Sequence, residues 1–146
     1  MSSDMSLSRF IRGVVVAKET EPIANIARQM RDGRVGAVVV TREDRPIGII
    51  TDRDIALRVV AEERDPTTTR VGDVVTYGPF TVCESDEIET VVRTMREHGV
   101  RRLPIVDANG QLVGIVTTDD IAILLGRELA ALADGICEST DAYESR

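Results

Sequence analysis

A chain of 146 residues has the length of one ordinary domain, and its 42% apolar and 29% charged residues are typical of a protein that folds around a core. A formal net charge of −7 argues against nucleic acid as a partner, because binding to a phosphate backbone depends on Lys and Arg. Aromatic residues make up only 3% of the chain, which also argues against stacking platforms for single-stranded nucleic acid.

The sequence shows no feature of a membrane or secreted protein. It has no apolar run long enough to span a bilayer, and its start, MSSDMSLSRF, lacks the layout of a signal peptide. We therefore expect a cytoplasmic protein without a membrane partner. The two cysteines, Cys83 and Cys137, form no CxxC motif, so neither a zinc site nor a redox pair is predicted.

The first predicted elements are a strand at residues 14–17 and an amphipathic helix. The helix begins beside Pro22, which suits a first turn, and ends at Gly33, which readily takes the left-handed conformation past a helix end. Apolar residues recur along it at spacings of three and four and share one face: Ile23, Ile26, Ala27 and Met30.

A hairpin and a second helix follow. Residues 37–41 and 47–50 are short runs rich in Val and Ile around a polar turn, so they are predicted to pair as strands. Their almost continuous apolar character indicates that both faces of the sheet are covered. The next helix begins near Asp52, and the polar segment 62–70, which contains Pro66, is predicted to be a linker.

The rest of the chain repeats this β-α-β-β-α pattern, which indicates an internal duplication. A strand at 80–83 precedes a helix that ends at Gly99, strands at 103–106 and 112–116 flank an Asn-Gly turn, and a helix begins near Thr118. The first of these helices repeats the apolar positions of its counterpart: Ile88, Val91, Val92 and Met95.

We expect one compact body made of two βαββα repeats. Residues 1–67 are assigned to the first repeat with an N-terminal segment, residues 68–126 to the second repeat, and residues 127–146 to a C-terminal helix and tail. The apolar residues of this last, amphipathic segment are Leu129, Leu132 and Ile136.

One motif occurs once in each repeat, as GIITDRDIA and as GIVTTDDIA. Both motifs place a Thr and, three residues later, an Asp where a strand gives way to a helix: Thr51 and Asp54, then Thr117 and Asp120. One interpretation is a capping box, in which these side chains bind free N–H groups of the first helical turn. The other is a ligand site, because a helix N-terminus attracts phosphate and a carboxylate can accept both hydroxyls of a ribose.

With VGAVVV at 35–40 and GVRRLPIVD at 99–107, the two motifs resemble a tandem pair of cystathionine β-synthase (CBS) domains. The resemblance covers about residues 14–125 and implies an α/β (α+β) fold, in which small mixed sheets flanked by helices are related by a pseudo-two-fold axis. It also implies two clefts between the repeats that bind AMP, ADP, ATP or S-adenosylmethionine. No other cofactor is required.

By this resemblance, the Thr and Asp of each motif supply the ribose and phosphate contacts of one cleft. Arg101 and Arg102 are expected to face the cleft of the first motif and to grip phosphate, although residue type alone would place them in solvent. The matching residues of the first repeat, Gly36 and Ala37, carry no charge. The cleft of the second motif is therefore expected to be weak, empty or suited to a less charged ligand.

Other candidate contacts lie near the motifs. Arg53 belongs to the first motif and has no basic counterpart in the second. Apolar walls for an adenine ring are expected from three residues that the alternative interpretation places in the core: Val16, Val38 and Val82.

The sequence favours binding over catalysis. Its single histidine, His98, lies at a predicted helix end, where an imidazole complements the helix dipole. No nucleophile elbow, P-loop or HExxH motif is present. We predict a non-catalytic, energy-sensing regulatory module that forms a homodimer through its apolar helices and acts on an unidentified protein. A ligand-free interaction scaffold and an unfamiliar enzyme are the alternatives.

Overall fold

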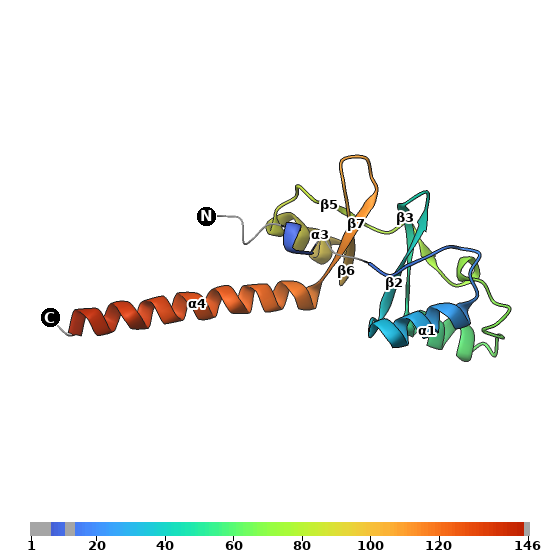
Figure 1. Ribbon diagram of the computed structural model, residues 1–146, viewed down its shortest axis with the longest axis horizontal. Helices are drawn as coiled ribbons and strands as arrows, with labels where there is room; N and C mark the ends of the chain where they lie inside the picture. Colours follow the sequence, from blue (N-terminus) through green and yellow to red (C-terminus); the bar gives the residue numbers. More distant parts are fainter. Residues whose placement is uncertain (1–6, 11–13, 145–146) are drawn as a thin grey trace.

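The computed structural model describes residues 7–10 and 14–144 and shows two small sheets side by side, with one long helix extending from the body (Figure 1). The fold is mixed α and β, as predicted. No helix within the described ranges combines the length and apolar content that crossing a membrane requires.

The first sheet contains four strands in the order β1-β2-β3-β4, of which only the β1–β2 pair is parallel. The strands are β1 (Val16–Ala17), β2 (Ala37–Arg42), β3 (Arg45–Thr51) and β4 (Thr76–Tyr77). The helical elements of this half are α1 (Ile23–Gly33), α2 (Asp52–Ile55), the π-helical segment η3 (Ala56–Val60) and the short 3-10 turn η4 (Val71–Asp73).

The second sheet contains three strands in the order β5-β6-β7, and again the first pair is parallel and the second antiparallel. The strands are β5 (Val82–Cys83), β6 (Arg102–Val106) and β7 (Leu112–Thr117). The helical elements are the 3-10 turn η2 (Leu7–Phe10), α3 (Ile88–His98) and α4 (Thr118–Glu144). The predicted hairpins and the predicted helix starts at Asp52 and Thr118 are confirmed.

Each sheet has its own core, and each core takes residues from beyond its repeat. Leu7 and Phe10 are buried with the second sheet, whereas Val71, Val74 and Val75 are buried with the first. This grouping differs from a division of the sequence at residue 67. The division followed the polar composition of the linker, while core membership depends on which apolar side chains the folded chain can bring to each sheet.

The segment 62–70 caps the start of α1. The N–H groups of Ile23 and Ala24 donate to the carbonyl oxygens of Thr69 and Pro66, each over 2.9 Å. Two of the N–H groups that a helix start leaves without a partner are satisfied in this way. At its other end, α1 runs through Gly33, and Arg34 adopts the left-handed conformation with φ of 52°. The expected glycine stop is therefore displaced by one residue.

The helix α4 is longer than predicted. It continues without a break for 27 residues through Gly126 and Gly135, so the helix after the second hairpin and the C-terminal segment are one element. At 1.5 Å per residue its length is roughly 40 Å. Most of it lies outside the body (Figure 1).

Three polar side chains, Glu19, Arg42 and Tyr77, join β4 to the first repeat, and we call them the Glu19 latch. Glu19 accepts hydrogen bonds from the Tyr77 hydroxyl and from the Arg42 guanidinium, each at 2.5 Å. The Tyr77 hydrogen bond, followed by that of Arg42, lowers the pKa of Glu19 from its ordinary value of 4.5. Because the folded pKa is below the unfolded one, the Glu19 latch stabilises the fold above pH 4.5 and is lost as the pH falls through the folded pKa.

The Glu19 latch predicts a pH-dependent effect of Glu19→Gln. At pH 7 the variant should melt at a lower temperature than the wild type, and the difference should shrink as the pH falls below 4.5, where protonated Glu19 resembles Gln. Thermal melts across this range measure the effect. Glu62→Gln, in the exposed linker, is the matched control and should melt like the wild type at each pH. A difference that stays constant with pH would contradict the prediction.

Candidate functional site

A cleft of about 540 Å³ lies between the two repeats, where α2 and α4 begin. Both repeats contribute to its walls: Thr51, Asp52, Arg53, Arg101, Arg102, Thr117, Thr118 and Asp119. The positive dipole ends of two helices favour anions, and three guanidinium groups add positive charge, which Asp52 and Asp119 offset only in part. The cleft is therefore suited to an anionic ligand.

The two motifs form capping boxes. In the first, the Thr51 hydroxyl accepts the N–H of Asp54 at 3.1 Å, and the Asp54 carboxylate accepts the N–H of Thr51 at 2.9 Å. Thr117 and Asp120 make the same pair of bonds at 3.1 and 3.0 Å. The capping interpretation is thus confirmed in both repeats.

Capping leaves each threonine able to bind a ligand. A hydroxyl carries one donor and two acceptor positions, and the cap uses only an acceptor position. Thr51 and Thr117 can still donate to a phosphate oxygen in the cleft that they line. The two interpretations of the motif are therefore compatible at the threonines.

Arg102 reaches across to the first repeat at Gly36. A Cβ atom on Gly36 would lie 3.7 Å from Nη2 of Arg102 and 3.3 Å from Oδ2 of Asp52. The missing side chain of Gly36 therefore leaves open the space between the guanidinium of one repeat and the first helical residue of the other. Within the described part of the chain, no ion pair involves Arg101, Arg102 or Arg53. Their charges face the cleft without a bound carboxylate.

The structure brings only some of the predicted ligand contacts together in the cleft. Of those residues, the cleft is lined by Thr51, Arg53, Arg101, Arg102 and Thr117. The threonines of both motifs thus line the same cleft, whereas the resemblance implied a separate one for each.

The two motif aspartates do not line this cleft. Asp54 is half-buried in its cap, with an oxygen 3.9 Å from Arg58. Asp120 lines a different pocket of about 410 Å³, beside Arg9 and Phe10.

The three valines that were expected to contact an adenine ring do not line the cleft. Val38 is buried in the first core and Val82 in the second, as the alternative interpretation has it. Val16, on β1, is 46% exposed and does not line the cleft.

Sequence reasoning missed three residues that line the cleft: Asp52, Thr118 and Asp119. They directly follow the motif threonines, in the first turn of each helix. Acidic residues are common in a first helical turn because they complement the helix dipole, so the residue type of Asp52 and Asp119 does not indicate a ligand site. Their position beside the motif threonines could have identified all three residues, because a side chain next to a capping threonine can line the same cleft.

The single histidine and the two cysteines do not line the cleft. His98 is the last residue of α3 and stacks on Phe80, with ring centroids 3.8 Å apart. Cys83 and Cys137 are free and exposed. Among the described residues, no three His, Cys, Asp or Glu side chains are grouped to hold a metal ion.

Two similar sheet-and-helix halves around a shared polar cleft define a tandem-repeat ligand-binding module. The CBS domain model matches residues 7–61 and again residues 71–127. The chain belongs to the CBS domain family, and it carries two copies of the domain.

Relatives in sequence and structure agree with this. An uncharacterized protein of Methanopyrus kandleri is 43% identical over 111 residues, which are 75% of this chain and 57% of that protein. Hypoxic response protein 1 of Mycobacterium tuberculosis is 36% identical over 111 residues, 75% of this chain and 77% of that protein. The structure of a CBS domain protein from Pyrobaculum aerophilum complexed with AMP has a TM-score of 0.72 at 32% identity, covering 86% of this chain and 98% of that one.

Proposed function

We propose that this chain is a non-catalytic regulatory module that binds an adenosine nucleotide in the cleft between its repeats and thereby senses energy state. The observation that carries the proposal is the convergence of three arginines and two threonine hydroxyls at two helix starts. The P. aerophilum relative, complexed with AMP, supports the choice of ligand class.

The charge of the cleft favours a phosphate-bearing ligand. An arginine fork can hold phosphate through two parallel hydrogen bonds, and Arg101 with Arg102 provides two such forks. Asp52 and Asp119 offer carboxylates to ribose hydroxyls from the same walls. S-adenosylmethionine carries no phosphate and has a cationic sulfonium, so AMP, ADP or ATP fits the three guanidinium groups better.

The proposal predicts thermal stabilisation by nucleotides. A ligand that binds only the folded state at 100 times its Kd stabilises that state by about 2.7 kcal/mol. AMP, ADP and ATP should therefore raise the melting temperature, while adenosine, which lacks phosphate, should do so much less. S-adenosylmethionine tests the alternative ligand. If none of these compounds shifts the transition or releases heat in calorimetry, the interaction scaffold is the better assignment.

The prediction that the protein is not a catalyst is tested separately, by incubation with ATP. ATP incubated with the protein should remain unchanged, as judged by chromatography of the nucleotides. Steady product formation that persists through repurification would instead identify an enzyme.

Exposed apolar residues support a second element of the function, self-association. Ile123, Leu129 and Leu132 are exposed on the helix that follows the second hairpin. We propose a cytoplasmic homodimer in which ligand in the cleft changes how the repeats pack and so how the module meets the protein it regulates. A ligand can do this only if its affinity differs between two arrangements.

A further inference from the structure

An apolar stripe runs along α4 after it leaves the second repeat. Its members are Leu125, Leu129, Leu132 and Ile136, which are 46%, 67%, 61% and 58% exposed. Their spacing of four, three and four residues places them on one face of the helix and matches the seam of a coiled coil. We call these residues the α4 stripe.

The α4 stripe continues into a groove on the second repeat. The groove has a volume of about 280 Å³ and is lined by Val92, Met95, Arg96, Val100, Thr118 and Ile121. Thr118 and Ile121 precede Leu125 by seven and four positions, so they lie on the same helix face as the α4 stripe. Groove and stripe form one continuous surface from α3 along α4.

A projecting helix of this kind needs a partner. Helices gain most of their stability from packing an apolar face, because helix formation alone is marginal in water. Ala133 flanks the stripe, and its small size allows another helix to approach closely. The neighbouring surface is therefore shaped for a second helix.

We propose that α4 pairs antiparallel with α4 of a second copy of this chain, which deepens the homodimer of the proposed function by assigning its surface. The α4 stripe is symmetric about the midpoint between Ala130 and Ala131, close to the centre of α4 (Thr118–Glu144). Antiparallel pairing about this midpoint sets Leu129 against Leu132 of the partner subunit. It also brings the last turns of each helix to the groove of the other copy.

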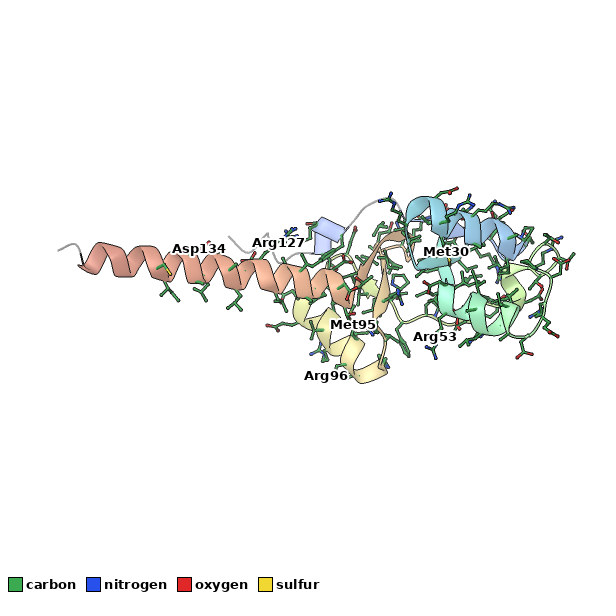
Figure 2. All side chains as sticks on the ribbon, turned by 90° about the horizontal axis from the view of Figure 1, so that it is seen from below. Met30, Arg53, Met95, Arg96, Arg127 and Asp134 are labelled. Atoms are coloured by element: carbon green, nitrogen blue, oxygen red, sulfur yellow. The ribbon has the colours of Figure 1, made fainter. Side chains whose placement is uncertain are left out.

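Charge selects the antiparallel orientation. From Glu128 to the end of α4 every charged residue is acidic, and the negative end of the helix dipole adds to this charge. Parallel pairing would place two acidic helix ends together. Antiparallel pairing places each one near Arg96, an exposed residue of the groove. Figure 2 shows Arg96 on α3, and Asp134 far out on α4.

The association is tested by light scattering on the full chain. The wild type should have twice the chain mass of 16.0 kDa, and Leu129→Glu/Leu132→Glu should have the mass of one chain. Both substituted residues are exposed, so the variant should keep the melting of its body. Leu129→Ala/Leu132→Ala, which preserves helix propensity, should dissociate at a higher protein concentration than the wild type.

A matched control is Leu57→Glu/Val60→Glu, which changes exposed apolar residues of the first repeat and should stay dimeric. A monomeric wild type, or a dimer that survives the α4 substitutions, would overturn the proposal. AMP calorimetry on the Leu129→Glu/Leu132→Glu variant reports on the cleft separately, so failure of the dimer surface is distinguishable from failure of nucleotide binding.

Cysteine crosslinking tests the orientation, with Cys83 and Cys137 replaced by Ser. Antiparallel pairing predicts that an oxidised mixture of Leu129→Cys and Leu132→Cys chains forms a disulfide-linked dimer, while each variant alone does not. Efficient crosslinking of either variant alone would show a parallel pair and refute the antiparallel assignment.

Discussion

Replacing Arg102 by Ala should lower the affinity for AMP by about 10- to 100-fold. Hydrogen bonds to charged groups contribute about 1.5–3 kcal/mol, and each 1.4 kcal/mol corresponds to a factor of ten. Arg102 is half-buried and reaches the space left by Gly36, so it is held where a ligand would contact both repeats. Titration calorimetry of wild type and variant measures the change.

Two further variants define the role of Arg102. Arg102→Lys keeps the charge but loses the planar fork, so its affinity should lie between those of wild type and Arg102→Ala. Arg93→Ala removes an exposed arginine of α3 that does not line the cleft, and its affinity should equal that of the wild type. Equal losses in Arg93→Ala and Arg102→Ala would mean that only the overall charge of the protein matters.

Gly48→Ala should destabilise the fold by about 3 kcal/mol, the upper part of the usual range for an overpacked core. Gly48 is buried on β3 opposite Tyr77 of β4. An added Cβ would lie only 2.4 Å from Cγ2 of Val75 and 2.8 Å from the carbonyl oxygen of Thr76. Because one of these atoms belongs to the backbone, a change of rotamer cannot relieve the clash, and β4 must separate from β3.

Urea denaturation measures the loss, and Gly126→Ala is the control. No atom lies within 4 Å of a Cβ on Gly126, and alanine favours a helix by about 1 kcal/mol over glycine. Gly126→Ala should therefore be at least as stable as the wild type. A Gly48→Ala protein with an unchanged midpoint would show that β3 and β4 are less tightly joined than the structure indicates.

Local patterns predicted most of the secondary structure because the duplication presented each pattern twice. The Asn-Gly turn and the apolar runs placed the hairpins, and the motif threonines marked both helix starts. The sequence pattern was misleading at a glycine, because glycine can either mark the end of a helix or lie inside one. The second repeat was expected to end at Gly126, yet α4 continues through this residue, since a glycine inside a helix costs only about 1 kcal/mol.

The cleft could be predicted only in part. Sequence spacing identified Thr51 and Thr117 but could not show that they line one cleft, because this depends on how the two repeats pack. Val38 illustrates the same limit. Its strand is apolar on both faces, so residue type did not distinguish a ligand wall from the core in which Val38 lies.

The unbroken course of α4 joins two distant places in the molecule. Its first residue, Thr118, lines the cleft, and its far end lies roughly 40 Å away. A rigid rod of that length converts a tilt of about 5° at its base into a displacement of roughly 3–4 Å at its tip. An anion that draws the first turn of this rod inward would thus move its tip by nearly the width of a side chain.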